Sequence, residues 1–297
     1  MKIKKLLFVT KFEELGFDAL RSLLNLRKSA LEHVVFVNVI ERDRVAMRRG
    51  KGYQKDEEIR LREAANIRFI DWAETLFEQG MEVGCYIVVG GLVPEVIKAT
   101  QKEDADLIVI GRSHKGVLEH LYAGSDVTEL LRRTWTPVLV YKQLSETAIS
   151  VKEPFVRPLL AIDWSAGSLR AAECIKTLKN VVQEVSLVHV AVEKDLKGAS
   201  SAMSIQKVRK EARHKLEEIC DRFEAAGIKA RAHVYIGDAK DEIEKAAKDF
   251  EATLIVLGSS SKTAWVERWL GSTPRKIAEE SIYPTLIVPP ERGEVME

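Results

Sequence analysis

The chain repeats itself at a fixed spacing, and this duplication constrains its fold more than any other feature. ADLIVIG at 105–111 matches ATLIVLG at 252–258, a spacing of 147 residues. Each copy is followed by a Gly-Ser pair, at 124–125 and 271–272, and then by a proline that opens an apolar run, at 137 and 284. The chain of 297 residues is therefore expected to contain two copies of one domain.

Upstream segments extend the duplication over the whole chain. Residues 4–12 parallel 157–165, residues 34–40 parallel 185–191, and residues 88–96 parallel 235–243. Between the copies, residues 143–156 are polar and lack periodicity. We therefore place the first repeat at 1–145 and the second at 155–292.

Short apolar segments alternate with segments of helical spacing in each repeat. The apolar segments are rich in Val, Ile and Leu without strict alternation, as in parallel strands covered on both faces. One helical stripe is formed by Leu61, Ala65, Phe69, Trp72 and Leu76, and it ends at Gly80. The pattern predicts two tandem, doubly wound, open parallel sheets of the α/β class, each with five strands and helices on both faces.

Composition narrows the class of protein. The net charge is +1, 46% of residues are hydrophobic and 31% are charged, so no global field favours nucleic acid or an acidic membrane. No apolar run approaches the length of a membrane span. Three scattered cysteines lack metal-ligand spacing and indicate thiols in a reducing compartment. We expect a cytoplasmic protein with neither membrane nor specific nucleic-acid partners.

A glycine closes the fourth apolar segment of each repeat, at Gly111 and Gly258. Ligands of open α/β sheets bind beyond the carboxyl ends of the strands, where glycine allows close backbone approach. Ser272 or Thr273 is expected to cap the next helix, with Pro274 as its first residue, and such a helix end can bind phosphate. Neither GK[ST] nor GxGxxG is present, and turns of this kind also occur without a ligand.

The loops share one frame, which is glycine, two residues, a fourth position, nine residues and Gly-Ser. It reads Gly258-Ser-Ser-Ser261 with Gly271-Ser272 in repeat two, and Gly111-Arg-Ser-His114 with Gly124-Ser125 in repeat one. This frame resembles the G-x2-G-x9-G-[ST] motif of nucleotide-binding universal stress proteins, and the resemblance covers nearly the whole chain as two tandem copies. It implies the adenine nucleotide alpha hydrolase-like fold of that family.

The resemblance also implies site residues. The family has an aspartate after its first strand, matched by Asp163, whereas our alignment puts Thr10 there in repeat one. Repeat two is therefore the better candidate site, comprising Asp163, Val190, Gly258, Ser261, Gly271, Ser272 and Thr273. Repeat one is degenerate, with weaker candidates Val39, Gly111, His114, Gly124 and Ser125. The family's second loop glycine is missing from both copies, and a Cβ there disfavours positive φ.

The expected function is a stress-response binding protein that holds ATP, ADP or AMP in repeat two, with no metal beyond nucleotide-associated Mg²⁺ and no catalytic residues assigned. A nucleotide-independent scaffold for unknown protein partners and a weak nucleotide hydrolase stay open as alternatives. The family resemblance implies that the final strand, at 138–141 and 286–288, pairs with its equivalent in dimers. Because unpaired edges are a liability, we expect the two repeats to pair these strands within the chain as a pseudo-dimer, and we also expect a further homodimer.

Three other features have functional and structural readings. The basic segment 41–55 is either a flap that attracts anions or a solvated loop. Trp265 and Trp269 form either an exposed apolar patch or a packing surface against the other repeat. His114 and His120 lie in one segment without a third ligand, so no metal site is predicted.

Overall fold

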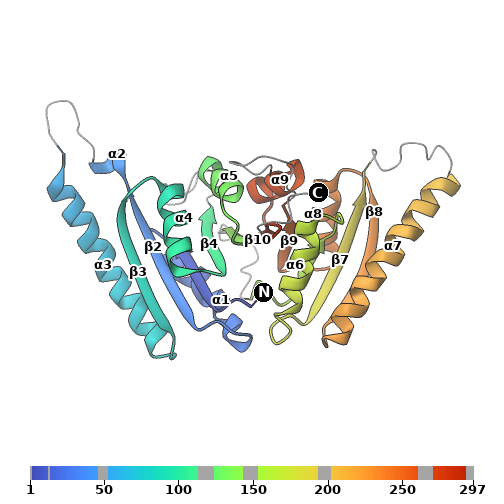
Figure 1. Ribbon diagram of the computed structural model, residues 1–297, viewed down its shortest axis with the longest axis horizontal. Coiled ribbons are helices and arrows are strands. Elements are labelled where there is room, and N and C mark those ends of the chain that lie inside the picture. Colours follow the sequence, from blue (N-terminus) through green and yellow to red (C-terminus); the bar gives the residue numbers. More distant parts are fainter. Residues whose placement is uncertain are drawn as a thin grey trace. The chain divides into compact units, whose positions relative to one another are not determined.

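The computed structural model describes residues 2–12, 14–45, 53–112, 124–142, 153–192, 202–259 and 270–291 (Figure 1). Its contacts divide the chain into two compact units, which lie within residues 3–145 and 146–297. Each has a parallel sheet of five strands, among the described residues, with helices packed on it.

The first unit has its first strand inside the sheet rather than at an edge. The strands are β1 (Lys5–Val9), β2 (His33–Glu41), β3 (Glu82–Gly90), β4 (Leu107–Arg112) and β5 (Val138–Lys142), in the order β3-β2-β1-β4-β5. The main helices are α1 (Glu14–Leu23), α3 (Lys55–Phe77), α4 (Leu92–Glu103) and α5 (Gly124–Arg133), with short helices η1 (Leu24–Lys28) and α2 (Arg42–Val45). Right-handed crossovers place α1 and α3 on one face, and α4 and α5 on the other.

The second unit repeats this topology. Its strands are β6 (Pro158–Ala161), β7 (Glu184–Ala191), β8 (Lys229–Ile236), β9 (Leu254–Gly258) and β10 (Thr285–Val288), in the order β8-β7-β6-β9-β10. Its helices are α6 (Ala166–Lys176), α7 (Ala202–Ala225), α8 (Ala239–Asp249) and α9 (Ser272–Glu280). The expected doubly wound tandem fold is confirmed. In each sheet the strand order reverses between the neighbouring first and fourth strands, β1 and β4 or β6 and β9. Open α/β sheets bind ligands at such a switch point.

Burial explains why the strands lack alternation in the sequence. Every residue of β9 and β10 is buried, as is every residue of β2 except its two ends. Strands covered on both faces need apolar side chains on both. The outermost strands β3 and β8 are instead mostly half-buried.

The long helices follow the predicted stripe. In α3, Ala65, Trp72 and Leu76 are buried against the sheet. Gly80 follows with a φ of +72°, and Gly227 follows α7 with a φ of +86°. Both glycines adopt the left-handed conformation that ends a helix at low steric cost. Among the described residues, no helix has the length and apolar character needed to cross a bilayer.

One alignment made from the sequence is wrong by one residue. Phe8 pairs with Phe36 in β2, and Leu160 pairs with Leu187 in β7. Because Phe36 and Leu187 are equivalent, Phe8 corresponds to Leu160 rather than Ala161. The apolar runs LLFV and LLAI can be aligned with Phe8 opposite either Leu160 or Ala161, so the sequence could not distinguish the two alignments. The backbone hydrogen bonds of the sheet do, and they place Lys11 rather than Thr10 opposite Asp163.

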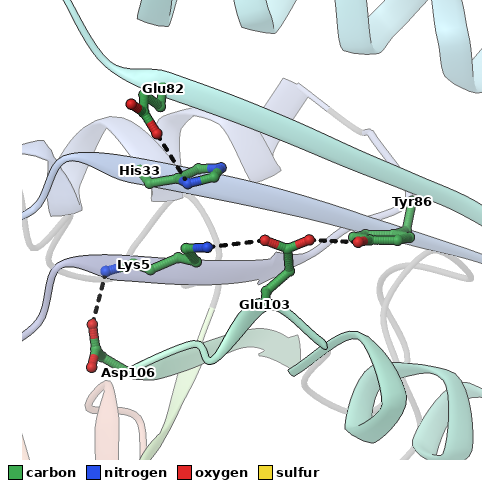
Figure 2. Close-up of polar contacts among 6 residues, drawn as sticks. All are labelled: Lys5, His33, Glu82, Tyr86, Glu103 and Asp106. Carbon is green, nitrogen blue, oxygen red and sulfur yellow. Dashed lines mark hydrogen bonds and ion pairs between the residues drawn. The ribbon is translucent and has the colours of Figure 1, made fainter. Parts of the chain in front are cut away.

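A polar network ties the amino ends of the strands in the first unit (Figure 2). The Glu103 carboxylate accepts a hydrogen bond from the Tyr86 hydroxyl and forms an ion pair with Lys5 Nζ at 3.0 Å. The Asp106 carboxylate accepts the Lys5 backbone N–H at 2.9 Å. His33 Nδ1 lies 3.5 Å from the Glu82 carboxylate. The network lies at the edge opposite the carboxyl ends of the strands, so it supports the fold rather than a ligand site there.

Glu103 provides a test of this network. The Tyr86 hydroxyl and then Lys5 lower the pKa of Glu103, so the ionised group stabilises the fold above its unfolded pKa. This contribution is lost as pH falls through the lowered folded pKa. We expect Glu103→Gln to lower the free energy of unfolding by about 1 kcal/mol at neutral pH, after solvent screening, and by less near pH 3.

Urea unfolding at both pH values measures this difference. Glu82→Gln is the matched control, because the Glu82 side chain is 81% exposed and should contribute little. An equal loss at both pH values for Glu103→Gln would contradict the electrostatic role.

Candidate functional site

The candidate site of the second unit lies at the carboxyl edge of three neighbouring strands. Asp163 follows β6, Gly258 ends β9, and Val190 lies near the end of β7. Strand β6 pairs with both β7 and β9, so these strand ends are adjacent. The structure therefore gathers three of the predicted residues at one edge of one sheet.

Gly258 has a packing role that the sequence did not reveal. A Cβ on Gly258 would lie 2.0 Å from the Ser168 nitrogen and 2.3 Å from the Gly167 carbonyl carbon. The reverse also holds, because a Cβ on Gly167 would lie 2.5 Å from the Ser259 carbonyl oxygen. The end of β9 and the first turn of α6 are thus in backbone contact. This contact accounts for the glycine without a ligand.

Asp163 shapes the turn between β6 and α6. Its Oδ1 accepts the Ser165 backbone N–H at 3.0 Å and also the Ser165 hydroxyl. Ser165 in turn caps α6 by accepting the Ser168 N–H at 3.2 Å. Asp163 is exposed, and its Oδ2 makes no hydrogen bond to any described residue. One carboxylate oxygen therefore holds the turn while the other can accept from a ligand.

An aromatic side chain lies next to this carboxylate. Trp164 has a φ of +64°, which is uncommon for a residue with a Cβ. Its ring centroid lies 5.3 Å from that of His189, and Lys215 Nζ lies 5.6 Å from the Trp164 ring centroid. A hydrogen bond holds the His189 ring in place, because its Nδ1 donates to the Ile162 carbonyl oxygen at 2.7 Å.

Helix α9 begins differently from the prediction. Gly271 is the N-cap, so Ser272 is the first helical residue and Pro274 the third, which corrects the expected Ser272 or Thr273 cap. Gly271 is buried and offers no side-chain cap. The backbone N–H groups of Ser272 and Thr273 make no hydrogen bond to the described residues, and the first turn has no acidic side chain. Such a helix start can receive an anion.

The first unit has opposite charge at the equivalent edge. Lys11 takes the place of Asp163, and Thr10 Oγ1 accepts the Phe12 N–H at 2.7 Å. Asn38 takes the place of His189 and donates to the Thr10 carbonyl oxygen at 2.9 Å. Phe12, at a φ of +59°, is the equivalent of Trp164, but its ring is buried against Trp72 at 5.1 Å.

A cavity of about 580 Å³ lies at this edge of the first unit. Val39 and the cations Lys11, Arg44 and Arg68 are among its lining residues. Arg44 belongs to the basic segment 41–55, so the described part of that segment does face a cavity. Residues 46–52 of the segment lie outside the described residues.

The remaining predicted residues of repeat one are spread over two elements. Gly111 lies in β4, Gly124 is the first residue of α5, and Ser125 is exposed in its first turn. Asp126 also lies in this first turn. Ser261 of repeat two lies outside the described residues, as do His114, His120, Trp265 and Trp269.

The described cysteines are not suited to nucleophilic or metal chemistry. None of the three forms a disulfide with another described residue. Burial raises the pKa of Cys85 to about 12 and that of Cys220 to about 11, so both stay protonated at neutral pH and are poor nucleophiles. Among the described residues, no group of His, Cys, Asp and Glu side chains could hold a metal ion.

Sequence reasoning missed three residues of this site. Gly167 was not singled out because its partner, Gly258, lies far away in the sequence. Ser165 follows Asp163 in a pattern typical of a helix cap, so this signal was available. Lys215 lies within a helix that carries many charges, and its position over Trp164 depends on tertiary packing.

Comparisons with known proteins agree with this architecture. The model of the family described as "Universal stress protein family" matches residues 2–142 and 156–289. A universal stress protein of Methanocaldococcus jannaschii is 30% identical over 139 residues, covering 41% of this chain and 85% of that protein. One from Bacillus subtilis is 29% identical over 146 residues, covering 45% and 99%. The crystal structure of a universal stress protein from Archaeoglobus fulgidus has a TM-score of 0.74 and 21% identity, covering 98% of this chain and 100% of that one.

The backbone contact at Gly258 predicts a large effect of one methyl group. We expect Gly258→Ala to lower the free energy of unfolding of the second unit by at least about 2 kcal/mol, because neither β9 nor α6 can withdraw without losing backbone hydrogen bonds. Urea unfolding measures the loss. Gly84→Ala is the control, since a Cβ there would lie 3.5 Å from its nearest neighbour. Alanine is also less unfavourable than glycine inside a strand. Equal stabilities for the two variants would show that the contact is loose.

Proposed function

The chain belongs to the universal stress protein family, in tandem form, and we propose that its second repeat binds an adenine nucleotide at the carboxyl edge of β6 and β9. One observation carries the proposal. Two adjacent parallel strands are followed by a carboxylate oxygen, at Asp163, and by the backbone N–H groups that start α9, and none of these has a hydrogen-bond partner among the described residues. A nucleotide has matching groups, namely hydroxyls that donate and phosphates that accept.

The start of α9 is the phosphate end of the proposed site. The N–H groups of Ser272 and Thr273, which have no partner in the described part of the chain, point to this end, and the two hydroxyls add further donors. The macrodipole of α9 favours negative charge at this end. Arg275 and Lys276 follow in the same helix and add positive charge close to its start. Each of these features lowers the free energy of a bound phosphate.

Asp163 and Trp164 form the nucleoside end. The Oδ2 atom of Asp163 accepts hydrogen bonds from ribose hydroxyls or from an exocyclic amine. The Trp164 ring offers a face on which a base can stack, a contact worth about 1–3 kcal/mol. Val190 supplies an apolar contact at the end of β7. The family resemblance assigns the same roles to Asp163 and Val190.

The proposal is confined to repeat two because repeat one has the wrong charges. Lys11 replaces Asp163 and cannot accept hydrogen bonds. Asp126 replaces Thr273 in the first turn of α5, where its carboxylate opposes a phosphate. The residues of repeat one at these positions therefore indicate which substitutions in repeat two should prevent nucleotide binding.

The wider biological role is part of the same proposal. We place the protein in the cytoplasm as a stress-response binding protein with no strong catalysis. The pairing of the final strands β5 and β10 with each other, and a further homodimer, remain predictions. A nucleotide-independent scaffold and a weak hydrolase are the outcomes against which the proposal is tested.

Titration calorimetry with ATP, AMP and adenosine tests the proposal. We expect binding to the wild-type chain and a loss of about tenfold in affinity for all three ligands with Asp163→Asn, equal to about 1.4 kcal/mol. Thr273→Asp copies the residue of repeat one and favours the helix. It should lower the affinity for ATP by at least about tenfold and leave the affinity for adenosine unchanged.

Lys11→Gln is the matched control, because it alters the equivalent residue of repeat one by one charge and should leave binding unchanged. The absence of heat and of a thermal shift at millimolar ATP would favour the scaffold and reject the proposal. Phosphate release from ATP that disappears with Asp163→Asn would identify the hydrolase instead.

A further inference from the structure

The outer edge of the second sheet has no hydrogen-bond partner among the described residues. Strand β8 is the last strand on its side of this sheet and pairs with β7. The Gly237 N–H donates inward to the Ala191 carbonyl oxygen. Since backbone groups alternate in direction along a strand, Ala232 and Val234 direct their N–H and C=O groups outward. These groups can receive another strand.

The first unit closes the equivalent edge with a side chain. Arg62 of α3 donates from Nη1 to the Ile87 carbonyl oxygen in the outer strand β3. Glu58 holds Arg62 in place with a hydrogen bond of 2.7 Å. The edge is thereby covered by a helix residue, one of the ways in which proteins protect edge strands.

The second unit keeps the cation at this edge but loses its acidic partner. Ile87 pairs with Asn38 and Val234 pairs with the equivalent His189, so Ile87 and Val234 correspond. On the helix, Arg209 replaces Arg62 and Ile205 replaces Glu58. Neither Arg209 nor its neighbour Lys210 forms an ion pair or hydrogen bond with the described residues. Arg209 is therefore not held against the strand as Arg62 is.

Small side chains open a groove at the same place. Ala230 and Ala232 of β8 occupy the positions of Val83 and Cys85 in β3. Residues 232–235 and the α7 cations Lys207, Arg209, Lys210 and Arg213 line a cavity of about 840 Å³ between α7 and this edge.

The groove has a net positive charge despite two ion pairs. Lys207 lies 3.9 Å from Glu211, and Arg213 lies 2.9 Å from Glu217. All four side chains are at least half exposed, so these pairs are weak and can exchange for a ligand carboxylate. Arg209 and Lys210 have no such pair to exchange within the described part of the chain.

We propose that the β8 edge binds an extended acidic peptide segment as an added strand, with its main chain on Ala232 and Val234 and its carboxylates on the α7 cations. This mode takes affinity from backbone hydrogen bonds and specificity from side chains. A nucleic acid fits less well, because the outward carbonyl groups of β8 would face phosphate oxygens. The proposal concerns a different edge of the sheet from the nucleotide site and does not depend on it.

Fluorescence anisotropy with a labelled decapeptide of alternating Glu and Thr, capped at both ends, tests the proposal. We expect a Kd on the order of micromolar at low salt. The double variant Arg209→Glu/Lys210→Glu should weaken binding at least tenfold. The same peptide with N-methyl groups on alternate residues keeps its charge but cannot donate along one edge, and it should also lose at least tenfold.

Lys245→Glu/Lys248→Glu is the matched control, because it makes the same charge change on α8 and should leave the affinity within twofold. Asp163→Asn should likewise leave peptide binding unchanged, which separates this result from the nucleotide proposal. Equal binding of the N-methylated and unmodified peptides would overturn strand addition. Tighter binding of a single-stranded oligothymidylate that displaces the peptide would overturn the peptide as the occupant.

Discussion

The contact between Gly258 and Gly167 is the constraint on which the carboxyl edge of the second unit depends. With no side chain on either residue, the end of β9 and the first turn of α6 meet backbone to backbone. This meeting fixes where α6 begins and hence the turn in which Asp163 and Ser165 are hydrogen-bonded. A residue with a Cβ at either position would force the strand and helix apart and would move the carboxylate of Asp163 with them.

The two repeats share their backbone hydrogen bonds and differ in the side chains around them. Asn38 and His189 both donate to the carbonyl oxygen at the end of the first strand, although one is an amide and the other an imidazole. Phe12 and Trp164 both have positive φ values. The scaffold thus tolerates exchange of residues at its edges, because the buried strands and the sheet register carry the stability of the fold.

Differences in core packing accompany the different surroundings of these two aromatic side chains. In the first unit the Phe12 ring packs on Trp72 of α3 and is buried. The equivalent residue of α7 is Ile219, which offers no aromatic partner. The Trp164 ring instead lies on His189, near the surface and beside Asp163. A difference in core packing thereby becomes a difference in the surface offered to a ligand.

The sequence by itself determined the duplication, the fold class and the C-terminal ends of the two long helices. These follow from local features, such as apolar runs without alternation, helical stripes and glycines such as Gly80 and Gly227 that stop helices. It also indicated Asp163 as a site residue, although only through a family resemblance. The spacing of apolar residues within one segment indicates which of its residues are buried, and this can be read without knowing which other segment covers them.

Only the tertiary structure decided which residues meet. The sequence alignment placed Thr10 opposite Asp163, whereas the hydrogen bonds of the sheet place Lys11 there, because a shift of one residue is invisible in an apolar run. The partner of Gly258 and the open edge of β8 likewise depend on segments that are distant in the sequence. Hydrogen-bond direction and backbone contact are properties of pairs of elements, and no single segment encodes them.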